Sequence, residues 1–141
     1  SKEGIAVTCI ERRVMPPGLI TACYPGFPTD LQSAFLAAMT LADGEGVLEE
    51  TIFENRFRIV PQLRQMGARI DCQKNKVCVS GVRTLCGTTL RAEELRGGAA
   101  LVIAGCAAQG RSVVKNRHFI ERGYEDICHD LCSLGARCKK E

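Results

Sequence analysis

Two segments, residues 31–42 and 99–108, carry apolar side chains around nearly the whole circumference of a helix. A helix that is apolar on all sides must be buried on all sides. We therefore predict that the two helices lie in contact at the centre of the fold, with strands and one-sided helices around them. This is an α/β fold with the helices inside and the sheets outside.

Short runs of β-branched and apolar residues, bounded by glycine, proline or asparagine, predict the surrounding strands. One-sided apolar stripes predict two further helices, each ended by a glycine in the C′ position. The expected strands are residues 5–10, 19–22, 47–52, 68–73, 77–82, 88–91 and 113–114. The apolar stripe of the first of these helices is Phe57, Val60, Leu63 and Met66, with an N-cap at Asn55 and Gly67 after the helix. The stripe of the second is Ile120, Tyr124, Ile127, Leu131 and Leu134, with Gly135 after the helix.

The pattern occurs twice. Asp30-Leu31-Gln32 is followed 64 residues later by Glu94-Leu95-Arg96, and Gly67-Ala68-Arg69 is followed 68 residues later by Gly135-Ala136-Arg137. Such an offset is typical of an internal repeat. We predict two βαβαββ-like units.

The repeat divides the chain into three parts. Residues 23–87 form the first unit and residues 88–141 the second, while residues 1–22 supply the closing strands of a preceding unit. We expect all three parts to belong to one domain.

The stretch at residues 23–35 is predicted to be a rigid turn that leads into the first apolar helix. Thr29 and Gln32 have the spacing of a capping box, which would make Thr29 the N-cap. Asp30 would then stand at the first helical position, where the helix dipole favours a negative charge. We expect an ionised carboxylate that points out of the helix end.

Composition excludes several classes of function. The net charge is +3 with both signs interspersed, and seven aromatic residues leave little for base stacking, so we expect no nucleic-acid partner. No apolar run is long enough to span a bilayer, and the first residues do not resemble a signal peptide. We expect a cytoplasmic protein with no membrane partner.

Nine cysteines are scattered through a chain that has its own apolar core, which disfavours a disulfide-stapled mini-fold. Cys72 and Cys78 would face each other only across a three-residue hairpin loop. Cys128, His129 and Cys132 are spaced like a metal or redox pair, but a structural zinc site needs four ligands. We expect buried free thiols in a reducing cytosol, no metal and no cofactor.

Two long strings, Phe-Pro-Thr-Asp-Leu-Gln at residues 27–32 and Ile-Phe-Glu-Asn-Arg-Phe at residues 52–57, resemble the UDP-N-acetylglucosamine enolpyruvyl transferase family. The resemblance extends from about Leu19 to the C-terminus and includes Glu94-Leu95-Arg96 and residues 121–125. Cys23 departs from the proline that is usual in the family.

The resemblance implies an enzyme of two domains, each an inside-out α/β barrel of three units, with the active site in the cleft between them. This chain would supply roughly the C-terminal third. Its partners would be the remaining N-terminal part of the enzyme and two small-molecule substrates, UDP-N-acetylglucosamine and phosphoenolpyruvate. The implied reaction is transfer of the enolpyruvyl group to the 3-hydroxyl of the sugar with release of phosphate, the first committed step of peptidoglycan synthesis.

The resemblance also implies roles for four residues. Asp30 would take the proton of the sugar hydroxyl, and Arg96 and Arg122 would bind substrate anions, Arg122 as a catalytic residue. Ile52 would bind the uracil nucleotide through its backbone. By spacing alone, Arg122 could instead form a helical ion pair with Glu125 or Asp126.

The resemblance implies that the family's N-terminal lysine and asparagine, and its mobile loop with the phosphoenolpyruvate-reactive cysteine, match no part of this chain, so we expect the isolated chain to be inactive. Two alternatives remain at the level of the sequence. One is a fragment of the shikimate-pathway enolpyruvyl transferase, which shares the fold but lacks the two long strings. The other is a non-catalytic two-repeat scaffold or metal-binding module, supported only by the cysteines.

Overall fold

The structure is a computed structural model that describes residues 14–141. It contains a four-stranded sheet in the order β1-β2-β4-β3 and a two-stranded sheet of β5 and β6. The strand predicted at residues 5–10 lies outside the described residues. The elements are β1 Gly18–Ile20, a 3-10 helix η1 Thr29–Leu31, α1 Gln32–Met39, β2 Glu45–Glu49, α2 Val60–Gln65, β3 Arg69–Gln73, β4 Lys76–Ser80, β5 Thr89–Arg91, α3 Leu95–Ala107, β6 Val113–Lys115, α4 His118–Glu121 and α5 Ile127–Ser133.

Each apolar helix connects two parallel strands. Helix α1 joins β1 to β2, and α3 joins β5 to β6, and both strand pairs are parallel. The hairpin of β3 and β4 adds to the far side of β2 in antiparallel pairing. The strand-helix-strand arrangement is therefore present twice, while the boundaries at residues 22, 87 and 88 remain a prediction.

The loop of the β3–β4 hairpin is shorter than the three residues that would place Cys72 opposite Cys78. Cys72 pairs with Val77 and Cys78 with Asp71 across the two strands. Cys72 and Cys78 therefore do not face each other, and both are free thiols.

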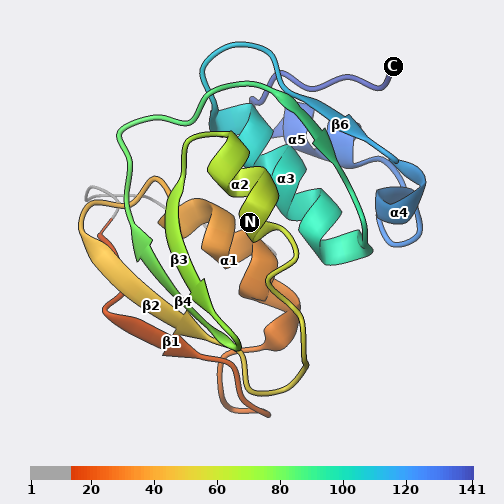
Figure 1. The fold of residues 1–141 in the computed structure, drawn as a ribbon. Helices are drawn as coiled ribbons and strands as arrows, with labels where there is room; N and C mark the ends of the chain where they lie inside the picture. Colours follow the sequence, from red (N-terminus) through yellow and green to blue (C-terminus); the bar gives the residue numbers. More distant parts are fainter. Residues whose placement is uncertain (1–13) are drawn as a thin grey trace, which may run out of the picture.

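The two apolar helices pack against each other at the centre, with the larger sheet on the α1 side and the β5–β6 pair beside α3 (Figure 1). Leu36 and Met39 of α1 and Leu101 of α3 are almost completely buried in one shared core. Strands β2 and β4 contribute Leu48 and Val77 to the same core. The predicted arrangement of central helices and outer sheets is confirmed.

Burial of these helices on all sides was a wrong expectation. Leu31 and Phe35, one turn apart, are 52% and 39% exposed, and Ile103 of α3 is 37% exposed. The reason is geometric, because the sheets and helices that pack against each central helix cover only part of its circumference. An apolar stripe stays uncovered on each central helix.

Helix α3 begins four residues earlier than predicted, because Glu94 caps it. The Glu94 carboxylate accepts hydrogen bonds from the backbone N–H groups of Arg96 and Gly97. Gly98 therefore lies inside the helix, where glycine costs about 1 kcal/mol relative to alanine. A Cβ atom at Gly98 would stand 2.7 Å from Cγ1 of Ile120 and 2.9 Å from Cβ of Ala92, so glycine is required here for close packing.

We expect Gly98→Ala to lower the free energy of unfolding by about 1–2 kcal/mol, because overpacking outweighs the gain in helix propensity. Gly105→Ala in the same helix is the matched control. Its Cβ would approach only the small Ser112 side chain, at 3.0 Å, so its effect should be small or stabilising. Urea unfolding of the two variants measures the difference. Equal effects would contradict the packing argument.

The first amphipathic helix, α2, starts later than its predicted cap. Asn55 has a positive φ of 56° in the turn before α2, so it is not the N-cap. The chain completes this turn before Val60, and Pro61 lies in the first turn of the helix, where its missing N–H costs little. The predicted buried face is confirmed, and Gly67 follows the helix with a φ of 95°.

The last predicted helix is broken into α4 and α5. Gly123 lies in the break, where a Cβ would stand 2.8 Å from Cδ2 of Leu95. Asp126 then starts α5 by accepting a hydrogen bond from the backbone N–H of His129, at 3.0 Å. The predicted stripe is therefore divided between two helices, and Leu134 at its end is 83% exposed.

Candidate functional site

Asp30 lies in η1, one turn ahead of α1, and not in the first turn of α1. The predicted capping box is absent, because Thr29 Oγ1 donates to Oε2 of Glu50 at 2.8 Å and makes no cap hydrogen bond. Gln32 is fully buried, and its Oε1 accepts from Ser33 Oγ at 3.0 Å. The charge-assisted hydrogen bond to the Glu50 carboxylate orients the Thr29 hydroxyl, and its oxygen accepts no hydrogen bond from the backbone N–H groups at the helix start.

Glu50 connects the turn that carries Asp30 to the turn at residues 51–53. Its side chain is only 2% exposed. Oε1 accepts from the Thr21 hydroxyl at 2.9 Å and from the backbone N–H groups of Ile52 and Phe53 at 2.8 and 3.1 Å. Sequence reasoning missed this residue, because an acid at a strand end has no local signal of burial.

Burial by itself would raise the pKa of Glu50. Its hydrogen bonds outweigh burial, so its pKa lies below the ordinary value. The hydrogen bond from Thr29 lowers the pKa most, followed by those from Ile52, Phe53 and Thr21. The carboxylate is therefore charged and fully used as an acceptor at neutral pH.

We expect Glu50→Ala to lower the free energy of unfolding by about 2–4 kcal/mol at neutral pH, because it leaves the buried Thr21 hydroxyl and two N–H groups without an acceptor. Glu49→Ala, at the neighbouring last residue of β2 and less buried, is the control and should cost far less. Chemical unfolding of both variants measures the difference.

The pH dependence gives a second readout for Glu50. A carboxyl group with a lowered folded-state pKa stabilises the fold above its unfolded value of 4.5, and this stability is lost as pH falls through the folded-state pKa. Glu50→Gln should therefore flatten the loss of stability below pH 4.5. An unchanged acid profile would contradict the role given to Glu50.

Three segments bring their charged side chains together at Asp30. Arg96 Nε lies 2.6 Å from Oδ1 of Asp30, and an Arg56 terminal nitrogen lies 4.0 Å from the same oxygen. The Asp30 side chain is 61% exposed, whereas Arg56 is 16% exposed and lies over the Phe53 ring at 4.7 Å from the centroid. A solvent-facing carboxylate with two fixed guanidinium groups is suited to binding a polyanionic substrate beside a proton acceptor.

Arg56 is a second residue that sequence reasoning missed. It lies inside the string at residues 52–57, but no role was assigned to it. Its position on the Phe53 ring and near Asp30 depends on the turn that Glu50 holds. The family string at residues 52–57 could have pointed to Arg56, because it covers the whole turn that carries this residue.

Ile52 contributes backbone to this site. Its N–H group donates to Glu50, while no residue within 14–141 donates to its carbonyl oxygen. The Ile52 side chain is 38% exposed, which differs from the core position that its residue type favours. As far as residues 14–141 show, the Ile52 carbonyl is thus the backbone group of this residue that a ligand can contact.

Arg122 follows α4 and is exposed. The alternative of a helical ion pair is wrong for Asp126, whose Oδ2 lies 3.1 Å from Lys140 Nζ, and no ion pair of Arg122 occurs among the described residues. Gly123 packs against Leu95, so the segment of Arg122 adjoins that of Arg96. No contact joins the Arg122 side chain itself to Asp30 in the described chain.

Residues 14–141 contain no group of three or more histidine, cysteine, aspartate or glutamate residues that could hold a metal ion. Within the same range, no helix combines the length and apolarity that crossing a membrane requires. Cys128 Sγ lies 2.7 Å from Cys138 Sγ, and the backbone N–H of His129 donates to Oδ1 of Asp126.

Residues 3–131 match the family model of EPSP synthase (3-phosphoshikimate 1-carboxyvinyltransferase). The UDP-N-acetylglucosamine 1-carboxyvinyltransferases of Vibrio parahaemolyticus and Salmonella arizonae are 42% and 47% identical over 139 residues, which is 99% of this chain and 33% of each relative. The chain therefore spans about a third of their length.

Solved structures agree with these sequence matches. The enolpyruvyl transferase NikO from Streptomyces tendae is 32% identical, with a TM-score of 0.80 over 91% of this chain and 30% of NikO. An EPSP synthase from Acinetobacter baumannii is 21% identical, with a TM-score of 0.61 over 80% of this chain and 27% of the synthase, which shows a shared fold.

The fold and these matches define a class, the enolpyruvyl transferases, and the chain belongs to the EPSP synthase family within it. Its resemblance to the UDP-N-acetylglucosamine 1-carboxyvinyltransferases is confirmed over nearly its whole length. The family consists of transferases, which agrees with the predicted reaction class.

Proposed function

We propose that this chain is part of an enzyme that transfers the enolpyruvyl group of phosphoenolpyruvate to the 3-hydroxyl of UDP-N-acetylglucosamine and releases phosphate. The observation that carries the proposal is the Asp30 carboxylate, exposed and held between two arginines from different segments. The product is a precursor of peptidoglycan, so the enzyme would act in the cytoplasm and support cell wall growth, cell shape and division.

Asp30 acts as the proton acceptor for the sugar hydroxyl. A carboxylate is a weak base in water and needs direct hydrogen-bond contact with the proton it takes. The 2.6 Å contact with Arg96 occupies Oδ1 of this carboxylate. When the phosphate or carboxylate of phosphoenolpyruvate takes over the Arg96 guanidinium, Asp30 is released to accept the proton of the 3-hydroxyl.

The arginines bind the anionic groups of the substrates and stabilise the charge that develops as the enolpyruvyl carbon is attacked and phosphate leaves. Arg96 and Arg56 stand at the carboxylate already. Arg122 has no ion pair within residues 14–141, and it reaches the same region when phosphoenolpyruvate binds, since its segment adjoins that of Arg96. The free carbonyl of Ile52 contacts the uracil nucleotide.

The site described here is one wall of a cleft. Asp30 is 61% exposed, and the central helices carry an uncovered apolar stripe at Leu31, Phe35 and Ile103. Both features are explained if the remaining N-terminal part of the enzyme covers the helices and supplies the opposite wall. The relatives' additional length is sufficient for such a part.

The test is a chimera in which this chain replaces the matching third of the Vibrio parahaemolyticus relative. The purified chimera should release phosphate from phosphoenolpyruvate with UDP-N-acetylglucosamine and not with 3-phosphoshikimate. Turnover of 3-phosphoshikimate would favour the shikimate-pathway alternative. A folded chimera that turns over neither substrate would overturn the proposal and leave the non-catalytic module.

A further inference from the structure

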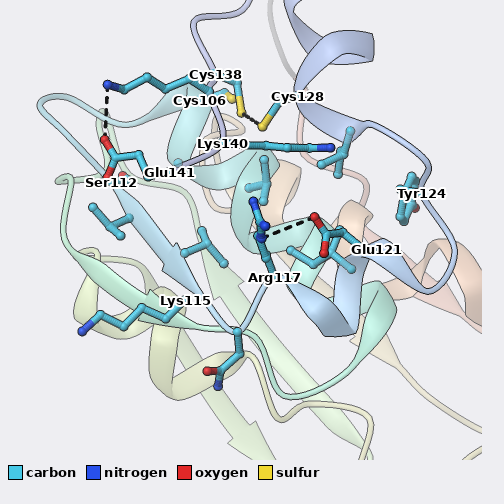
Figure 2. A pocket seen from close by; sticks show the side chains of 18 of the residues that line it. Cys106, Ser112, Lys115, Arg117, Glu121, Tyr124, Cys128, Cys138, Lys140 and Glu141 are labelled. Atoms are coloured by element: carbon cyan, nitrogen blue, oxygen red, sulfur yellow. Dashed lines mark hydrogen bonds and ion pairs between the residues drawn. The ribbon is translucent and has the colours of Figure 1, made fainter.

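Four of the described cysteines gather at one end of the second unit, away from Asp30. Cys106 stands in the last turn of α3, Cys128 and Cys132 lie one turn apart on α5, and Cys138 follows α5. Cys128 Sγ is 2.7 Å from Cys138 Sγ, and Cys132 Sγ donates to the Cys138 carbonyl at 3.0 Å. Figure 2 shows Cys106, Cys128 and Cys138 side by side.

Three of these thiols line a cavity of about 920 Å³ between α3, β6, α4, α5 and the C-terminal residues. Its walls carry six arginine and lysine side chains against three glutamates, so positive charge is in excess. Lys140 extends along the wall between the thiols and Arg117 (Figure 2). The cavity therefore favours an anionic ligand of small size.

We propose that Cys128 and Cys138 are a reversible redox pair, which forms a disulfide by exchange with an anionic low-molecular-weight disulfide of the glutathione type bound in this cavity. The two sulfurs are already nearly within bonding distance, since a disulfide bond is about 2.05 Å long. The charge of the cavity selects the oxidant. The pair is independent of the enolpyruvyl transfer chemistry.

The proposed thiol–disulfide exchange takes place in two steps. One cysteine, as thiolate, attacks a sulfur of the small disulfide, which forms a mixed disulfide and releases the first small thiol. The second cysteine then attacks the protein-side sulfur of the mixed disulfide, which closes the Cys128–Cys138 bond and releases the second small thiol. Two electrons pass to the small disulfide, and the two thiol protons of the protein leave on its products.

The surroundings keep the pair reduced until an oxidant is bound. Burial, with the contact to Cys138, raises the pKa of Cys128 to about 12, and burial also raises the pKa of Cys138. Since only the thiolate attacks, free exchange in solution is slow at neutral pH. Binding of the oxidant beside Arg137 and Lys140 compensates by raising its local concentration.

The disulfide would fix the C-terminal residues against α5. Cys128 and Cys138 are ten positions apart, and the residues beyond Cys138 already form ion pairs from Lys140 to Asp126 and from Glu141 to Arg111. Closing this short loop removes conformations of the unfolded chain. We expect oxidation to raise the midpoint of thermal unfolding by about 5–10 °C.

The experiment treats the purified chain with oxidised glutathione at low ionic strength and maps disulfides by mass spectrometry of non-reduced peptides. The expected result is a Cys128–Cys138 link that dithiothreitol reverses and that forms several-fold faster with oxidised glutathione than with the cationic disulfide cystamine. High salt should remove this difference. Cys128→Ser and Cys138→Ser should each abolish the link and the thermal shift.

Cys78→Ser, on β4 and outside the cavity, is the control and should leave the link unchanged. Arg137→Gln should slow the reaction with oxidised glutathione but not with cystamine. The proposal is overturned if wild-type protein shows no such link, if Cys106 pairs with Cys138 instead, if both oxidants react equally fast at low salt, or if the purified protein holds zinc at the thiols.

Discussion

Replacing Asp30 with alanine in a full-length enzyme that carries this chain is expected to lower turnover about 10²–10⁴-fold, the usual contribution of a positioned proton acceptor. Binding of UDP-N-acetylglucosamine should weaken much less, because Ile52 and the rest of the nucleotide site are unchanged. The physical reason is that the carboxylate contributes mainly when the hydroxyl proton moves. Steady-state kinetics of the chimera, with nucleotide-sugar binding measured by calorimetry, separate the two effects.

Asp30→Asn refines this test, because the amide keeps the size of the side chain but cannot take a proton. It should lose turnover almost as severely as alanine. Asp71→Asn, at an exposed position on β3, is the control and should be fully active. Near-normal turnover of either Asp30 variant would rule out its role as the base.

The isolated 141-residue chain is expected to turn over phosphoenolpyruvate and UDP-N-acetylglucosamine at least about 10⁵-fold more slowly than the complete enzyme. Positioning of two reactants in a closed site accounts for about 7–11 kcal/mol of barrier lowering, and one open wall cannot supply it. With Asp30 61% exposed and Arg96 36% exposed, water also weakens the electrostatic stabilisation that a closed cleft provides.

Phosphate release by the purified chain, compared with the chimera at equal concentration, measures this loss. Circular dichroism and the unfolding transition establish that the chain is folded, so that inactivity is not mistaken for unfolding. Release at a rate close to that of the chimera would show that the opposite wall is unnecessary.

The sequence by itself determined the centre of this fold and its family. Two segments that are apolar on nearly every side predicted two helices in contact, and α1 and α3 do pack together, because this contact removes apolar surface from water. The long strings at residues 27–32 and 52–57 predicted the enolpyruvyl transferases, since strings of that length are specific. Asp30 and Arg96 were named from the family resemblance, which also includes Glu94-Leu95-Arg96, and they form an ion pair.

Only the tertiary structure decided how the site is held and which faces are left open. Thr29 bonds to Glu50, 21 positions away, and Arg56 approaches Asp30 across 26 positions. A local capping pattern cannot reveal a partner at that distance, because the carboxylate that orients the Thr29 hydroxyl comes from a distant strand end. Likewise, the distribution of apolar residues around a helix predicts which surface is favourable to bury. Whether Leu31 and Phe35 are in fact covered depends on which elements pack beside them, and both are exposed in this structure.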